Sequence, residues 1–128
     1  MVCLARAPEG EWVSSEVLVA AANLPHAYVS KVMRRMVEAG LAEGRKGWHG
    51  GFRLAKPAHD IRFSDVLAAS GDEVNFAGCA FGYPSCNAKD PCALHDSWLN
   101  LGILFRQWAQ SHTLADAGDL REITQFSA

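Results

Sequence analysis

Residues 25–57 read PHAYVSKVMRRMVEAGLAEGRKGWHGGFRLAKP, and this stretch decides the fold. Its first half predicts a helix from about Pro25 to Ala39, because proline suits a first helical position and Gly40 suits a C-terminal cap. One face of this helix is apolar and consists of Val29, Val32, Met33, Met36 and Val37, at the spacing of a buried stripe. The opposite face is polar and basic and carries His26, Ala27, Ser30, Lys31 and Arg34, with Arg35 at its margin.

Another helix precedes this one. Ser14 or Ser15 offers an N-cap for a helix through Ala21, and Asn23-Leu24-Pro25 breaks it. Two helices joined by a tight turn, the second with a basic outer face, are typical of a helix-turn-helix. The alternative is a two-helix core hairpin whose charges are merely solvated.

The second half of the stretch predicts a β-wing. Two short strands, near residues 41–43 and 52–54, enclose the glycine-rich basic loop GRKGWHGG. Glycines let such a loop approach a phosphate backbone closely, and Arg45, Lys46 and Arg53 supply positive charge. A wing directly after a helix-turn-helix favours DNA binding over the core hairpin.

Composition and charge agree with a single DNA-binding domain. The chain has 128 residues, of which 49% are hydrophobic and 20% charged, and this composition excludes wholesale disorder. The net charge of −2 is segregated, since residues 25–62 hold eight of the twelve basic side chains and three of the fourteen acidic ones. No signal peptide or membrane-length apolar stretch is visible, so we expect a cytoplasmic protein without a membrane partner.

Three cysteines, Cys79, Cys86 and Cys92, fall within fourteen residues, and His95 follows shortly after. Clustered cysteines in a reducing compartment are more often metal ligands than disulfides. Soft thiolates with one imidazole suit an iron–sulfur cluster or a zinc ion. Cys3 stands apart in an apolar turn, and we interpret it as a small buried hydrophobic residue.

A long helix is predicted from about Cys92 to Ser111, with Asp90-Pro91 as its cap and first position. Its apolar residues recur at alternating spacings of four and three, as in a coiled-coil seam. The seam consists of Leu94, Trp98, Leu101, Phe105 and Trp108. A core helix of a monomer is the alternative, but so long a seam favours a dimer interface.

The predicted architecture is therefore mainly α-helical with a small β-wing. A winged helix-turn-helix domain, whose first helix we expect to be truncated, occupies residues 1–72, and a cysteine-bearing loop occupies 73–91. The dimerisation helix and a short segment capped by Thr113 span 92–118, and 119–128 form a tail. Within the first domain, Ser64 is expected to cap a short helix that ends at Gly71.

The wing and the cysteine loop together resemble the winged-helix transcriptional regulators typified by IscR and NsrR, which use an iron–sulfur cluster. The resemblance covers nearly the whole chain, from about residue 4 to residue 117. The matching pieces are VEAGL at 37–41, GGFRLAKP at 50–57, the three cysteines, and TLAD at 113–116.

The resemblance implies which residues bind metal and DNA. It places Cys79, Cys86 and Cys92 at three cluster-ligating positions and His95 at the fourth, with a [2Fe-2S] cluster favoured over [4Fe-4S]. On the DNA side, it places a recognition helix in the major groove through Ala27, Ser30, Lys31 and Arg34, and the wing in the minor groove through Lys46. His26, Arg35, Arg45, Trp48 and His49 complete the expected DNA-binding set.

The chain departs from the family pattern in three places. Six residues separate Cys79 from Cys86 where five are usual, and Trp48-His49 replaces a small Pro-Gly element at the wing tip. By the resemblance, we also expect the chain to begin deep in the first helix. In some relatives an acidic residue from that region of the partner subunit completes the coordination, so this polypeptide can lack a complete cluster.

We therefore expect a homodimeric transcriptional regulator, of the repressor type, whose affinity for a double-stranded operator depends on an iron–sulfur cluster that senses redox state, nitric oxide or iron supply. The alternative is a zinc-stabilised winged-helix adaptor that binds protein partners. An enzyme with a small-molecule substrate is not expected, because the sequence shows no paired carboxylates, phosphate-binding loop or nucleophile–base arrangement.

Overall fold

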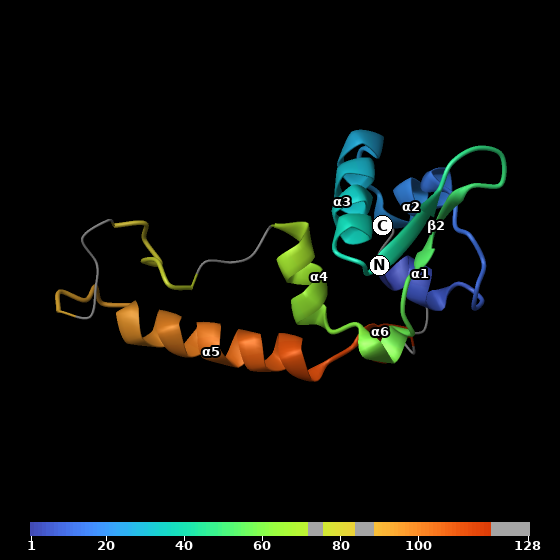
Figure 1. Cartoon of the computed structure of the whole chain (residues 1–128). Helices are drawn as coiled ribbons and strands as arrows, with labels where there is room; N and C mark the ends of the chain where they lie inside the picture. Colours follow the sequence, from blue (N-terminus) through green and yellow to red (C-terminus); the bar gives the residue numbers. More distant parts are fainter. Residues whose placement is uncertain (72–75, 84–88, 119–128) are drawn as a thin grey trace.

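The computed structural model describes residues 1–71, 76–83 and 89–118 (Figure 1). The helices are α1 (Val2–Arg6), α2 (Ser15–Ala22), α3 (His26–Glu38), α4 (Phe63–Ser70), α5 (His95–Ser111) and α6 (Leu114–Gly118). The strands are β1 (Ala42–Arg45) and β2 (Gly51–Leu54), and a short 3-10 turn, η1 (Ala58–Asp60), follows them. This mainly helical fold with a two-stranded wing confirms the predicted fold class.

The predicted recognition helix is α3, which is amphipathic as its sequence requires. Val29, Met33 and Met36 are buried, and Met36 is fully enclosed. The helix ends at Glu38 with Ala39 as its C-cap, and Gly40 follows with a φ of 75°, a left-handed conformation that glycine adopts without strain. Its start follows Pro25 at the N-cap, so the predicted bounds hold to within one residue at each end.

The wing is an antiparallel hairpin with a third extended segment beside it. Its register runs from Ala42 opposite Leu54 to Arg45 opposite Gly51. Val13 and Phe52 exchange two backbone hydrogen bonds of 2.8 Å, which tie the segment before α2 to β2. A Cβ on Gly51 would lie 2.1 Å from the carbonyl oxygen of Val13, so only glycine permits this approach.

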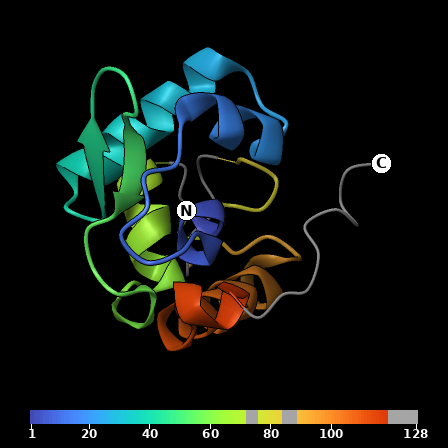
Figure 2. The ribbon, with the colours of Figure 1, turned by 90° about the vertical axis from the view of Figure 1, so that its right-hand side faces the viewer.

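The core lies where the helix-turn-helix meets the first and last helices. Its buried residues are Leu4, Leu18, Val29, Met33, Met36, Leu41, Ala42, Ile61 and Leu114. Contacts between α1 and α6 bring the two ends of the described chain together beneath the wing, as Figure 2 shows. The N–H of Leu114 donates to the carbonyl of Ile61 at 2.9 Å and fastens α6 to this core.

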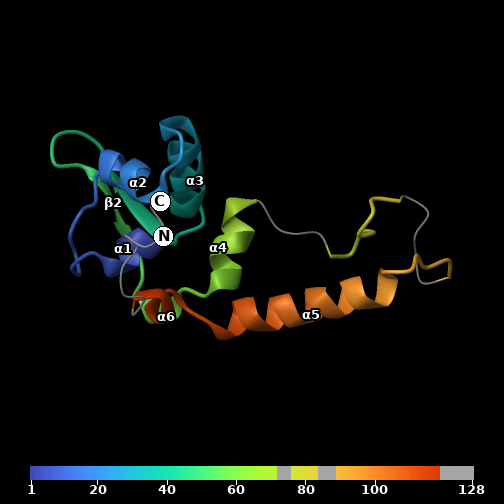
Figure 3. The same ribbon diagram turned by 180° about the vertical axis from the view of Figure 1, so that it is seen from behind.

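Helix α5 extends away from the winged-helix domain, and the described residues 79–83 and 89–94 lie toward its far end (Figures 1 and 3). Near its C-terminus, Trp108 stacks on Phe63 of α4 with ring centroids 5.2 Å apart. Near its N-terminus, Phe76 packs on Trp98 at 4.8 Å and on Phe105 at 5.5 Å. One face of α5 is therefore covered within the same chain.

Two predicted helix starts are wrong. Helix α5 begins at His95 rather than Cys92, because its first i to i−4 hydrogen bond joins the N–H of Trp98 to the carbonyl of Leu94, the N-cap residue. Helix α4 begins at Phe63, before Ser64. The carboxylate of Asp65 accepts a 2.9 Å hydrogen bond from the N–H of Arg62 and sets that start.

Candidate nucleic-acid interface and metal centre

The outward face of α3 is polar, basic and exposed. His26, Ala27, Ser30, Lys31 and Arg34 all lie on it. The Oγ of Ser30 is 3.3 Å from Nδ1 of His26, and Arg34 pairs with Glu38 at 3.0 Å. The side chain of Arg34 is 79% exposed, and such a surface pair contributes well under 1 kcal/mol, so Arg34 can exchange Glu38 for a phosphate.

Arg35 lies apart from this face. Its guanidinium donates a hydrogen bond to the carbonyl of Ser70, the last residue of α4, and the side chain is only partly exposed. A Cβ on Gly71 would come within 3.0 Å of Arg35 Nη1. Arg35 therefore joins the recognition helix to the helix that precedes the cysteine segment, and its place in the DNA-binding set stays a prediction.

Two arginines of the wing are anchored on Trp12. Arg45 and Arg53 lie over the Trp12 ring, with guanidinium carbons 4.5 and 4.4 Å from its centroid. Arg53 also pairs with Glu43 at 2.7 Å. These contacts hold the hairpin against the segment before α2 and orient its basic side chains.

The wing tip is a turn formed by residues 47–50, closed by a 2.9 Å hydrogen bond from the N–H of Gly50 to the carbonyl of Gly47. Arg45 donates a hydrogen bond to the carbonyl of His49 and so stabilises the turn. The backbone of His49 has a φ of 63°. Lys46 is exposed and makes no hydrogen bond or ion pair within the described part of the chain. Trp48 is 89% exposed.

A groove of about 680 Å³ separates α3 from the wing. Ser30 and Arg34 line its helical side, and Arg45 and Lys46 line its wing side. The lining has three positive side chains, Arg34, Arg45 and Lys46, and two negative ones, Glu16 and Glu38. The positive side chains on both walls suit a sugar–phosphate strand. Recognition helix and wing can therefore address neighbouring grooves of one duplex.

The cysteine segment brings two of the predicted metal ligands together. The Sγ atoms of Cys79 and Cys92 are 3.7 Å apart. This is too long for a disulfide, whereas two thiolates at about 2.3 Å from one tetrahedral ion lie about 3.8 Å from each other. The N–H of Phe81 donates to Cys79 Sγ at 3.4 Å, a kind of bond that tunes iron–sulfur ligands.

The other two predicted ligands are not brought to these thiols by the described structure. Cys86 lies outside the described residues. The backbone N–H of His95 bonds to the carbonyl of Cys92 at 3.1 Å, but within the described residues His95 does not complete a group of three potential ligands with Cys79 and Cys92. Within residues 1–71, 76–83 and 89–118, no group of three or more potential ligands is assembled.

The predicted dimer seam divides into two faces. Trp98 and Phe105 pack on Phe76 of the same chain, as the monomer alternative requires. The rest of the seam is partly exposed, although Trp108 also stacks on Phe63, and with a neighbouring leucine it forms what we name the α5 strip. The strip consists of Leu94, Leu101, Leu104 and Trp108, which are 43%, 51%, 63% and 49% exposed.

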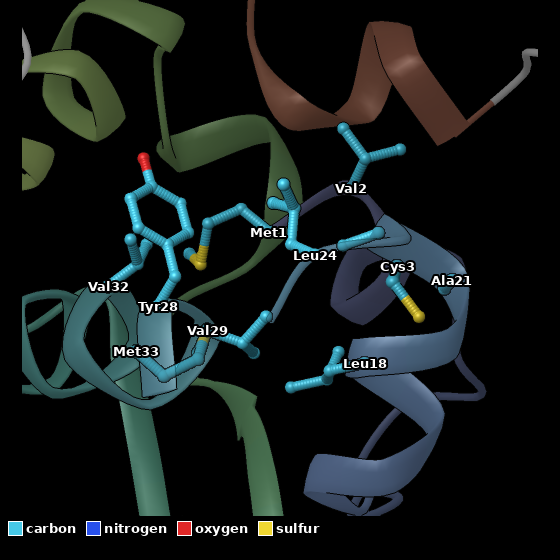
Figure 4. A pocket seen from close by; sticks show the side chains of 11 residues that line it. Met1, Val2, Cys3, Leu18, Ala21, Leu24, Tyr28, Val29, Val32 and Met33 are labelled. Carbon is cyan, nitrogen blue, oxygen red and sulfur yellow. The ribbon is translucent and has the colours of Figure 1, made fainter. Parts of the chain in front are cut away.

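Cys3 lines an apolar pocket of about 300 Å³ between α1, α2 and α3, next to Leu18 and Ala21 (Figure 4). The pocket also includes Tyr28, and Met1 closes one side. Burial lowers the pKa of the Met1 amino group. Cys3 therefore lies among hydrophobic side chains that pack against the winged-helix core, but it is partly buried rather than fully buried as predicted.

Three residues that shape these sites were missed from the sequence. From the sequence, no role is assigned to Trp12 or Gly102, and Phe76 falls in the predicted cysteine-bearing loop, residues 73–91. Gly102 is nevertheless recognisable from the sequence, because a glycine inside a long helix is unfavourable unless another group approaches it closely. A Cβ on Gly102 would lie 2.5 Å from Cβ of Phe76.

A helix-turn-helix, a wing with basic side chains and a groove between them define a winged-helix DNA-binding protein. The chain belongs to the Rrf2 family, described as iron-dependent transcriptional regulators, whose family model matches residues 1–119. The protein is a DNA-binding transcriptional regulator and not an enzyme. Among the described residues, no helix has the length and hydropathy needed to cross a membrane.

Individual relatives agree with this assignment. The candidate HTH-type regulator YwgB of Bacillus subtilis is 30% identical and aligns over 98% of this chain and 84% of its own length. The HTH-type transcriptional regulator IscR of Vibrio campbellii is 27% identical over 78% of this chain and 59% of its own length.

Solved structures show the same fold. CymR (YrzC), described as the global cysteine regulator of B. subtilis, superposes with a TM-score of 0.73 and 17% identity, covering 94% of this chain and 88% of that one. IscR of T. potens superposes with a TM-score of 0.70 and 21% identity, covering 99% and 83%.

Proposed function

We propose that this chain is a homodimeric repressor whose affinity for operator DNA is controlled by an iron–sulfur cluster. The observation that carries the cluster is the 3.7 Å separation of the Cys79 and Cys92 thiols beside the N–H of Phe81. Cys86 and His95 complete the proposed ligand set, and a [2Fe-2S] centre is favoured over [4Fe-4S]. In this proposal the chain consists of a winged helix-turn-helix domain (1–72), a cysteine-bearing loop (73–91), a dimerisation helix with a short segment (92–118) and a tail (119–128).

The family supports an iron-based signal without defining it. IscR is among the relatives, whereas CymR carries the description of a cysteine regulator. The cluster, when bound, would supply a centre that reacts with oxidants and nitric oxide. The residues of this chain connect that centre to DNA, because the cysteine segment follows α4, and Arg35 holds the end of α4 against the recognition helix.

DNA contact is proposed through the outward face of α3 and the wing. Ala27, Ser30 and Lys31 are proposed to read base edges, and His26 to support Ser30. Arg34 and Lys46 are proposed to bind the phosphates of the strand that lies in the groove between helix and wing. Arg45 is proposed to orient the wing tip through its hydrogen bond to the His49 carbonyl, and the His49 ring packs edge-to-face on Trp48.

The deciding experiment is anaerobic reconstitution with iron and sulfide, followed by DNA binding. Cys79→Ser and Cys92→Ser should lose the visible absorbance of the cluster, because each removes a thiolate from a four-ligand site. Cys3→Ser is the matched control and should retain it, since Cys3 lies in the apolar pocket. Equal absorbance in all three variants would overturn the ligand assignment.

Two further measurements separate the alternatives. His95→Cys should retain a cluster and lower its reduction potential, because a thiolate adds negative charge at the iron. Zinc accepts the same thiol spacing, so metal analysis of the purified protein decides between the two centres. A colourless protein with stoichiometric zinc would favour the adaptor interpretation.

A further inference from the structure

The wing tip carries an aromatic side chain with no structural role in the described fold. Trp48 is 89% exposed, far more than any other large hydrophobic residue that the structure describes. Its one ring neighbour there is His49, in an edge-to-face contact with centroids 6.0 Å apart. Exposing an indole so fully forfeits the burial energy that a tryptophan normally contributes to a core.

The tip is built to hold this side chain outward. The turn of residues 47–50 is closed by the Gly50 to Gly47 hydrogen bond, and Arg45 braces it through the carbonyl of His49. A Cβ on Gly50 would lie 2.3 Å from the carbonyl oxygen of Arg45, so this turn requires glycine at position 50. Figure 1 shows the wing projecting beyond the helices.

The surroundings of Trp48 favour DNA over another partner. Lys46 precedes it and lines the groove that separates α3 from the wing. If one sugar–phosphate strand occupies that groove and α3 lies in the major groove, the wing tip faces the adjacent minor groove. A rigid, basic hairpin with an exposed aromatic tip has the composition of proteins that insert an apolar wedge there.

We propose that Trp48 is a wedge that inserts between base pairs from the minor groove and bends the operator. This inference rests on the proposed DNA contact of the wing and adds to it a source of sequence preference. Partial unstacking costs least at pyrimidine–purine steps, which are the most easily kinked. Trp48 therefore selects a flexible step beneath each wing, without a hydrogen bond to any base.

The test compares the parent chain with Trp48→Ala and Trp48→Phe, using duplexes selected from a random 30-base-pair library and dye pairs at the duplex ends to measure bending. Trp48→Ala should bind about 10-fold more weakly, bend the duplex less and lose the enrichment of pyrimidine–purine steps. Trp48→Phe should retain most of each effect, because it keeps an aromatic wedge.

A spectroscopic reading is independent of affinity. The difference in fluorescence between the parent and Trp48→Phe reports the Trp48 indole. Adding duplex to the parent should quench this fluorescence and should protect the indole from quenching by acrylamide. Ile103→Ala is the control, since it truncates an exposed apolar side chain on α5, remote from the wing. All variants alter exposed positions, and thermal melting checks that they fold.

The outcomes distinguish the wedge from the function on which it rests. If the parent binds and bends DNA and Trp48→Ala does so equally, the wedge is overturned while DNA binding by α3 and the wing stands. If the parent binds no selected duplex, with or without reconstituted cluster, the proposed function is overturned and the wedge falls with it.

Discussion

At the scale of single residues, neighbouring arginines on α3 have different partners. Arg34 is exposed and pairs with Glu38 on its own helix, while Arg35 reaches the carbonyl of Ser70 on α4. The helical turn of about 100° per residue separates them just enough for one to face solvent and the other to face a neighbouring element. Substituting Arg35 should therefore affect stability, whereas substituting Arg34 should affect DNA binding.

We predict that Arg35→Ala lowers the free energy of unfolding by about 1–3 kcal/mol, because it removes a charged hydrogen bond to a helix C-terminus. Arg34→Ala should change stability by less than about 0.5 kcal/mol and weaken DNA binding. Urea unfolding and duplex titration measure the two effects. The assignment fails if Arg35→Ala is as stable as the parent.

Lys46 provides a second prediction at this scale. Lys46→Ala should weaken binding to all duplexes alike and lower the slope of log K against log salt by about one unit, because one phosphate contact is lost. Lys56→Ala makes the same charge change at the base of the wing and should leave the slope unaltered. Identical slopes for both variants would remove Lys46 from the interface.

At the scale of elements, the contact between α5 and the cysteine segment depends on Gly102. We predict that Gly102→Ala destabilises the protein by about 1–3 kcal/mol, because its Cβ would overlap Phe76. The gain of about 1 kcal/mol in helix propensity only partly offsets this clash. Thermal unfolding measures the effect, with Asn100→Ala, an exposed position of the same helix, as control.

Local sequence patterns predict some of these elements and contacts, and tertiary packing decides the others. The apolar stripe of α3 and the glycines of the wing depend on local patterns, so the helix and hairpin could be predicted. The start of α5 could not, since Pro91 offers an N1 position that the backbone near Cys92 does not use. The Arg35 contact with Ser70 and the stacking of two arginines on Trp12 depend on tertiary packing, which periodicity does not encode.

At the scale of the whole molecule, the α5 strip lies beside the face that Phe76 covers. Leu101 and Leu104 share one side of the helix, whereas Ile103 is about 200° from Leu101 and lies on the other side. An exposed apolar row on a long helix is what a second copy of the chain would cover in a two-fold dimer.

We predict that the parent is a dimer at micromolar concentration and that Leu101→Glu converts it to a monomer, because a buried, unpaired carboxylate opposes association. Ile103→Glu, with the same change outside the strip, should remain dimeric. Sedimentation velocity separates the species. A monomeric parent, or a dimeric Leu101→Glu variant, would contradict the assignment.

The bond pair between Val13 and Phe52 has a consequence for how this protein can change its DNA preference. The anchored part of the hairpin ends where Arg45 faces Gly51, and the five residues between them take no part in the sheet. Changes in this loop therefore leave the paired strands in place. A new operator preference can therefore arise by replacing residues 46–49, with Gly50 kept because of its close approach to Arg45, while the core, the recognition helix and the cysteine segment stay as they are.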